Sequence, residues 1–245
     1  MAQRVKGSPH SPRDSRGQRR PRRPREVEPA GQPEAPISLR EALRSIAVLS
    51  ALLAVTVGLG IAMGAAVRPE PSGAFSNCHT ARAIAPRTYV APPAMCTDPR
   101  KNYTATILTT KGNVGIVMPA GQAPVTRNNF IVLAVNGYYD GLRFWRSEDW
   151  VVQTGDPHDD GRGGPGYTLP EEPTKEGWQP GSLGMARPIN GPLNGGQFFI
   201  TRDNWPGDGP GSIVYNRFGS VVLGFDILTQ LSAGDRVLRI EVKPG

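Results

Sequence analysis

A run of 23 residues without a charged side chain, Ser45 to Val67, divides this chain of 245 residues into two unlike parts. As a helix rising about 1.5 Å per residue, it would span roughly 34 Å, enough for the hydrocarbon core of a bilayer. It is longer than the apolar region of about 7–15 residues in a cleaved signal peptide, although cleavage within residues 62–66 stays open as an alternative. The sequence therefore predicts a lead-in and transmembrane helix over residues 38–67.

Positive charge is concentrated before this run. Residues 1–44 carry 11 Lys and Arg against 5 Asp and Glu, whereas residues 97–245 carry 14 against 15. Basic residues accumulate on the cytoplasmic side of membrane spans, so the N-terminus is predicted to lie inside and the C-terminal domain outside the cytoplasm. The favoured role of the basic residues is to set this topology. Contact with anionic lipid or nucleic acid is the alternative, and no specific nucleic-acid partner is expected.

The two segments that flank the run are both predicted to lack a packed core. Residues 1–37 contain an Arg-Pro run and few apolar side chains, which predicts a disordered tail. Residues 68–101 are rich in Pro and Ala without periodicity, which is typical of a linker. This linker holds both cysteines, Cys78 and Cys96, and outside the cytoplasm one disulfide between them is the simplest outcome. Two free thiols or an intermolecular pair remain alternatives.

From residue 102 to 245 the pattern changes to short β-branched stretches separated by turns. With 30 Gly and 25 Pro in the chain, long helices are disfavoured. Two helices are predicted, over residues 123–136 and 225–231. Strands are predicted over residues 103–110, 114–118, 150–153, 181–186, 197–201, 213–223 and 237–242. Short strands with tight turns and two capping helices predict an all-β domain built as a closed antiparallel barrel.

The stretch from Phe144 to Asp156 is the candidate site. It places one permanent cation, Arg146, among large apolar side chains, and the neutral amide of Gln153 follows seven residues later. The stretch offers no nucleophile and no general base of suitable pKa, which fits a substrate that is held and polarised rather than attacked. The alternative is a plain surface strand on which Arg146 pairs with Glu148 or Asp149.

Strand alternation would place Trp150 and Val152 on one face and Val151 and Gln153 on the other. Farther along, residues 158–160 (His-Asp-Asp) resemble a set of metal ligands, but a solvated loop is the preferred interpretation. We therefore expect neither a metal nor a cofactor.

Six motifs follow one another in a fixed order: Phe144-x-Arg146, Gln153-x-Gly155-Asp156, Gly163 to Tyr167, Met185-Ala186, Asn194 to Ile200 and Phe218-Gly219. In these motifs the chain resembles the cyclophilin family of peptidyl-prolyl isomerases from residue 102 to its end. The resemblance implies an eight-stranded antiparallel barrel capped by two helices, and isomerase activity on proline-containing polypeptides.

The resemblance also implies roles for single residues. Arg146 is expected to be the catalytic arginine and Gln153 the glutamine that helps to hold the substrate backbone. Phe199 is expected to form the floor of the proline pocket, with Gln197 beside it. The other positions expected to bind substrate are Phe144, Trp150, Val151, Ala186, Arg187, Trp205 and Tyr215.

Several of these positions depart from the usual family pattern. Arg187 stands where Asn is usual, Tyr215 where His is frequent, and Trp205 lies farther from Phe218 than the usual rim tryptophan. The combined prediction is a membrane-anchored prolyl isomerase that assists the folding of exported or cell-envelope proteins. The alternative is a membrane-tethered module that binds proline peptides with little or no turnover.

Overall fold

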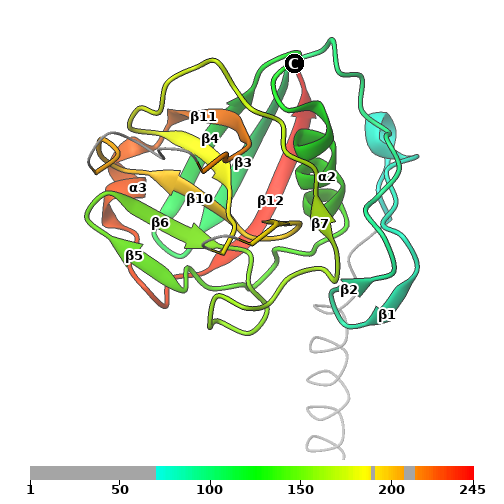
Figure 1. The fold of residues 1–245 in the computed structure, drawn as a ribbon, viewed down its shortest axis with the longest axis horizontal. Coiled ribbons are helices and arrows are strands. Elements are labelled where there is room, and N and C mark those ends of the chain that lie inside the picture. The colour runs from blue at the N-terminus through cyan, green and yellow to red at the C-terminus, as the bar shows by residue number, and fades with distance from the viewer. Residues whose placement is uncertain (1–69, 189–190, 207–212) are drawn as a thin grey trace, which may run out of the picture. The chain divides into compact units, whose positions relative to one another are not determined.

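The computed structural model describes residues 70–188, 191–206 and 213–245 (Figure 1). The predicted tail over residues 1–37 and the predicted lead-in and membrane helix over residues 38–67 lie outside them. Within the described part of the chain, no helix has the length and hydropathy needed to cross a membrane.

The described elements are, in chain order, η1 (Gly73–Phe75), β1 (Ala83–Ala85), β2 (Thr88–Tyr89), β3 (Tyr103–Thr109), β4 (Gly112–Met118), α2 (Pro124–Val135), β5 (Arg146–Glu148), β6 (Val151–Thr154), β7 (Thr168–Leu169), β8 (Ser182–Met185), β9 (Leu193–Asn194), β10 (Phe198–Thr201), β11 (Arg217–Leu223), α3 (Phe225–Gln230) and β12 (Val237–Pro244).

Eight of these strands form one antiparallel sheet in the order β12-β3-β4-β11-β8-β10-β6-β5. The β3–β4 hairpin pairs without a break from Tyr103↔Met118 to Thr109↔Gly112. Buried and less buried residues alternate along β3, because successive side chains of a strand point to opposite faces. The predictions of an all-β domain, an eight-stranded antiparallel sheet and two helices are confirmed.

The prediction of a closed barrel is wrong, because the sheet curls without a continuous ladder between its end strands, β5 and β12. Residues just before these two strands are joined by the isolated bridge Arg143↔Arg236, and the amide N–H of Val237 donates to the carbonyl of Leu142 at 2.9 Å. The amide N–H of Phe144 also donates to the carbonyl of Asp235 at 2.8 Å. The chain turns at Gly141, whose φ is 77°, before it reaches β5.

Helix α2 packs its middle into the core of the sheet (Figure 1). The ring of Phe130 lies 5.3 Å from that of Phe198 and 5.1 Å from that of Phe218, measured between centroids. The free N–H groups of Val125 and Thr126 in its first turn donate to the carboxylate of Glu172, at 2.9 and 2.8 Å. An acidic side chain at a helix N-terminus satisfies these donors and complements the helix dipole.

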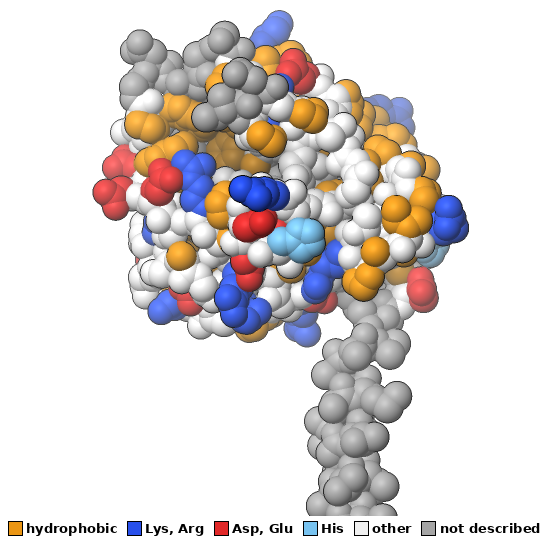
Figure 2. All heavy atoms as spheres, turned by 60° about the horizontal axis from the view of Figure 1, so that its bottom comes forward, with side chains coloured by type: hydrophobic (Ala, Val, Ile, Leu, Met, Phe, Trp, Pro, Cys, Tyr) orange, Lys and Arg blue, Asp and Glu red, His pale blue; other side chains and the backbone are white. Residues whose placement is uncertain are grey.

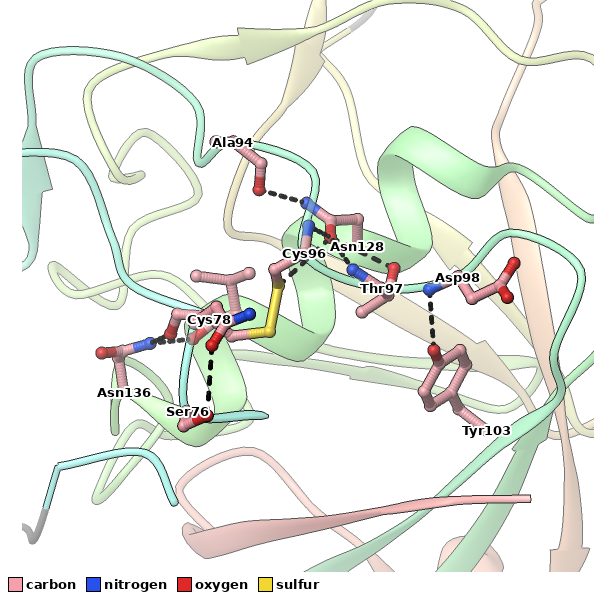
Figure 3. The surroundings of a disulfide bond; sticks show 11 residues. Ser76, Cys78, Ala94, Cys96, Thr97, Asp98, Tyr103, Asn128 and Asn136 are labelled. Carbon is pink, nitrogen blue, oxygen red and sulfur yellow. Dashed lines mark hydrogen bonds between the residues drawn. A yellow bond between two sulfur atoms is a disulfide. The ribbon is translucent and has the colours of Figure 1, made fainter. Parts of the chain in front are cut away.

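Residues 70–101 do not form the predicted linker but an arm that packs against α2 as part of the same compact unit. A disulfide joins Cys78 to Cys96 within the arm (Figure 3). The side-chain oxygen of Asn128 on α2 accepts from the amide N–H of Cys96 at 2.9 Å and from that of Thr97 at 3.1 Å. The side-chain amide of Asn136, which follows the helix, donates to the carbonyl of Cys78 at 2.7 Å.

The fully buried Arg127 of α2 also depends on the arm. Its guanidinium donates to the carbonyls of Asp98 at 3.2 Å and Pro99 at 3.0 Å, and to that of Pro119. It lies 5.3 Å from the ring centroid of Tyr103, and burial lowers its pKa. Burying a cation without such acceptors would cost folding free energy. The arm is therefore a necessary part of the folded core.

The middle of the arm contacts the segment after α2 and the loop that follows β6. The amide N–H of Tyr89 donates to the carbonyl of Pro165 at 2.8 Å, and the Arg87 guanidinium donates to the carbonyls of Tyr138 at 2.8 Å and Asp140 at 2.6 Å. Gly166 has a φ of 90°, and a Cβ there would lie 2.9 Å from the Tyr89 carbonyl oxygen. The β1–β2 hairpin therefore supports the loop that carries residues 161–167.

Candidate active site

Strands β5 and β6 place Arg146 directly opposite Gln153. The guanidinium Nη1 of Arg146 donates to Oε1 of Gln153 at 3.4 Å. The side-chain amide nitrogen of Gln153 donates to Oε1 of Gln197 at 2.9 Å. The amide nitrogen of Gln197 in turn donates to the carbonyls of Gly161 at 3.0 Å and Gly163 at 2.7 Å. Because both N–H groups of Gln197 are used, its oxygen faces Gln153, which leaves the Gln153 oxygen facing the cation.

A small apolar pocket of about 40 Å³ lies beside this polar row. Its buried members are Val151, Ala186 and Phe199, and four partly buried aromatic side chains pack against them: Trp150, Trp178, Trp205 and Tyr215. On the face drawn in Figure 2, hydrophobic side chains floor a hollow whose edge carries basic and acidic groups. A pocket of this kind suits a compact apolar ring next to a fixed cation.

The aromatic side chains of the pocket form one connected group. Trp205 lies 4.9 Å from Trp150 and 5.4 Å from Tyr215, and Phe199 lies 5.4 Å from Tyr215, measured between ring centroids. Trp178, which the sequence analysis does not identify, stacks on Phe199 at 5.3 Å with 27° between the ring planes. It comes from the irregular stretch before β8, where no motif marks it.

A second, larger cavity of about 220 Å³ also borders Arg146. Its lining contains five expected site residues: Arg146, Gln153, Ala186, Arg187 and Gln197. It also contains four residues that sequence reasoning misses: Trp145, Gly161, Pro188 and Asn194. The two cavities share Arg146, Gln153, Ala186 and Arg187, so the cation borders both a small space with aromatic walls and a wider one.

Arg187 borders both cavities, but its guanidinium is held by neighbouring loops. Its Nε donates to the carbonyl of Gly191 at 2.7 Å, and Nη1 donates to that of Val214 at 3.0 Å and to the carboxylate of Glu171. These bonds give the residue a structural role at the position where the family usually has Asn.

Phe144 is not a lining residue of either cavity, which corrects its assignment as a substrate contact. Its side chain is 1% exposed and belongs to the main core. Phe144 precedes β5 and follows Arg143 of the isolated bridge, so the two-residue alternation that would align it with Arg146 does not reach it. The alternation predicted for Trp150 also fails, because Trp150 lies in the turn before β6 and not in the strand itself. Its side chain packs with Val151 instead.

Arg146 also makes the ion pair that the surface-strand alternative predicts. Its Nε lies 2.6 Å from Oε1 of Glu148, and its side chain is 34% exposed. The hydrogen bond from Arg146 holds the pKa of Glu148 below its usual value. The carbon of the guanidinium lies 5.4 Å from the ring centroid of Trp150. The ion pair and the pocket position therefore coexist.

The carboxylate of Asp156 organises the loop behind the site. It accepts from the backbone N–H groups of His158 at 2.7 Å and Asp160 at 3.1 Å, and from that of Gly161. Ligand atoms of Asp156, His158 and Asp160 lie within 4.8 Å of one another. Because the buried Asp156 carboxylate already accepts these backbone hydrogen bonds, the cluster is explained by loop structure.

The family model described as cyclophilin type peptidyl-prolyl cis-trans isomerase/CLD matches residues 104–243. A peptidyl-prolyl cis-trans isomerase of Synechococcus elongatus is 34% identical over 142 residues, covering 56% of this chain and 94% of the relative. Peptidyl-prolyl cis-trans isomerase B of Bacillus subtilis is 37% identical over 124 residues, covering 49% of this chain and 84% of the relative.

Two solved structures of the same family superimpose on this chain. A Cryptosporidium parvum cyclophilin type peptidyl-prolyl cis-trans isomerase superimposes with a TM-score of 0.52 at 25% identity. The superposition covers 59% of this chain and 99% of that one. Its structure in the presence of the dipeptide Ala-Pro gives a TM-score of 0.51 at 26% identity, over 58% and 99% of the two chains. The chain belongs to the cyclophilin-type peptidyl-prolyl cis-trans isomerases and is an enzyme that isomerises X–Pro peptide bonds.

Proposed function

We propose that this enzyme uses Arg146 to isomerise X–Pro bonds in polypeptides outside the cytoplasm. The observation that carries the catalytic part is the position of the Arg146 guanidinium between an aromatic pocket and the amide of Gln153. The pocket of Val151, Ala186 and Phe199 would hold the proline ring. The larger cavity beyond Arg146 gives the residues before proline room to rotate.

The chemistry follows from the resonance of the amide. Rotation about X–Pro crosses a barrier of about 18–20 kcal/mol, because the planar bond has partial double-bond character. In the twisted transition state the proline nitrogen loses conjugation and holds a localised lone pair. A guanidinium that donates to this nitrogen stabilises the twisted state more than the planar one, and it remains charged at every physiological pH.

Gly184→Ala is expected to raise the KM for a proline peptide by at least about fivefold. Gly184 pairs with Phe199 across β8 and β10, and a Cβ on it would lie 2.4 Å from both Phe199 Cζ and Trp178 Cη2. The added methyl group must therefore displace the aromatic stack. Gly177→Ala is the matched control, because a Cβ there meets no atom within 4 Å. Equal KM values for the two variants in steady-state assays would contradict this role of the stack.

Three features support a site of action outside the cytoplasm. The uncharged run over residues 45–67 is long enough to anchor the chain, and the Arg excess before it favours a cytoplasmic N-terminus. The disulfide between Cys78 and Cys96 belongs to an oxidising compartment. We therefore propose that the substrates are exported or cell-envelope proteins.

Protease added to intact cells is expected to remove the domain over residues 70–245 while the cells stay sealed. A cytoplasmic protein followed in the same experiment controls for lysis. Protection of the domain until the cells are lysed would overturn the proposed orientation, and recovery of the chain in the soluble fraction would overturn the anchor.

A proline-isomerisation assay on the full chain measures how fast the protein turns over. It distinguishes an efficient isomerase from the alternative function, a tethered module that binds proline peptides with little turnover. We expect catalysed isomerisation of an X–Pro peptide that saturates with substrate. Saturable binding with turnover at the uncatalysed rate would favour the binding module instead.

A further inference from the structure

Glu148 is placed between two functional groups of the site. Its Oε1 accepts from Nε of Arg146 at 2.6 Å, and its Oε2 accepts from the indole N–H of Trp150 at 2.9 Å. One carboxylate thus joins the cation to the wall of the apolar pocket, with one oxygen for each partner. Hydrogen bonds to an ionised acceptor are stronger and more directional than neutral ones.

The local backbone explains why Glu148 reaches both partners. Arg146 and Glu148 are the first and last residues of β5, two positions apart, so their side chains leave the same face of the strand. The pair Glu148↔Val151 ends the ladder between β5 and β6, and Trp150 lies in the turn between them. A short turn therefore brings the carboxylate and the indole together.

Arg202 holds this turn through several hydrogen bonds. Its amide N–H donates to the carbonyl of Trp150 at 2.7 Å, and its guanidinium donates to Ser147 Oγ at 2.8 Å and to the carbonyl of Glu148. The same guanidinium donates to the carbonyl of Leu231 at 2.9 Å, beyond α3. The turn around Glu148 is thus held by contacts that do not involve its carboxylate.

The carboxylate limits how the Arg146 guanidinium can turn. Three contacts surround that planar group: Glu148 on Nε, Gln153 on Nη1 and the face of Trp150. With Nε bonded to Glu148 and one N–H of Nη1 to Gln153, the other N–H groups of Nη1 and Nη2 can donate to a substrate nitrogen. Orienting a donor before the reaction avoids reorganisation in the transition state.

The same carboxylate limits how the wall of the pocket can move. Trp150 reaches Trp205 at 4.9 Å between ring centroids and packs against the buried members of the pocket. Without a bond to its N–H, the indole would be held by ring contacts alone. An exposed ion pair adds little to stability, so the value of Glu148 lies in geometry rather than in folding energy.

We propose that Glu148 is a positioning residue, which orients the Arg146 guanidinium for catalysis and holds Trp150 as the wall of the proline pocket. This inference rests on the proposed role of Arg146. It predicts that loss of the carboxylate changes both kcat, through Arg146, and KM, through Trp150.

The test is steady-state kinetics of the full chain with an X–Pro peptide. Glu148→Gln keeps the size of the side chain, but its single amide oxygen cannot accept from both partners. We expect kcat/KM to fall about five- to tenfold, shared between a lower kcat and a higher KM. Asp149→Asn is the matched control, since it removes the neighbouring charge, and its kcat/KM should stay within about twofold of wild type.

Two further variants separate positioning from a general structural effect. Trp150→Phe keeps an aromatic wall but has no N–H, so adding Glu148→Gln to it should raise KM no further. In an Arg146→Ala background, Glu148→Gln should leave kcat unchanged. Independent, multiplicative effects in either pair would overturn the inference, and so would a Glu148→Gln variant with kcat/KM equal to or above wild type.

The control on the proposed function is Arg146→Ala alone. If that variant is inactive and Glu148→Gln behaves as wild type, only the positioning role fails. If Arg146→Ala turns over at the wild-type rate, the proposed catalytic role itself is wrong.

Discussion

Arg146→Ala is expected to lower kcat for an X–Pro peptide by about two to three decades. Arg146 is the cation between the apolar pocket and Gln153, so its loss removes the donor that would meet the proline nitrogen. Peptide binding should weaken much less, because Phe199 and the surrounding aromatic rings remain. Steady-state kinetics would measure kcat, and titration of the enzyme with the peptide would measure binding.

Arg146→Lys should be nearly as poor, because an ammonium group lacks the planar fork that contacts Glu148 and Gln153 together. Arg143→Ala is the matched control, since it removes an exposed arginine of the same segment whose partner, Asp159, lies 3.6 Å away. The melting temperature of Arg146→Ala should change by only a few degrees. A folded Arg146→Ala enzyme with wild-type kcat would contradict the assignment.

Reduction of the disulfide is expected to lower the melting temperature by about 6–12 °C. The bond between Cys78 and Cys96 closes a loop with a sequence separation of 18, which contributes about 3 kcal/mol by restricting the unfolded chain. For a domain of this size, 1 kcal/mol corresponds to about 2–4 °C. Thermal unfolding with and without reductant measures the shift.

The double variant Cys78→Ser, Cys96→Ser controls this experiment. The chain has no other cysteine, so the variant should melt near the reduced wild type and show no response to reductant. An alkylating reagent should label the native wild type only after reduction. Labelling without reduction, or a melting temperature that reductant leaves unchanged, would count against a stabilising bridge.

The parts of the fold that the sequence predicts well are those with local periodicity. The hairpin around Gly112 and helix α2 after Pro124 follow from alternation, turn chemistry and an apolar stripe. The arm over residues 70–101 escapes prediction because it has almost no periodic structure. Its contacts are instead with side chains far along the chain, such as Asn128 and Asn136.

The same contrast between local patterns and long-range contacts explains which site residues the sequence predicts. Arg146 and Gln153 face each other because they belong to one tight pair of strands, which motif spacing already indicates. The family resemblance places Phe144 at the site, but it lies next to the Arg143↔Arg236 bridge and its side chain belongs to the core. The sequence does not mark Trp178, because its position depends on the bare Cα of Gly184, which leaves room for its stack on Phe199. No local pattern encodes that contact.

The buried Arg127 bears on where a recombinant fragment of this enzyme should begin. The family match starts at residue 104, yet the backbone carbonyls of Asp98 and Pro99 accept hydrogen bonds from this guanidinium. A fragment cut at the family boundary would leave the cation with the carbonyl of Pro119 but without those of Asp98 and Pro99, and Asn128 would lose the amide donors of Cys96 and Thr97. Expression trials that start near residue 70 keep these partners, so the boundary of the homologous region and the boundary of the folding unit differ.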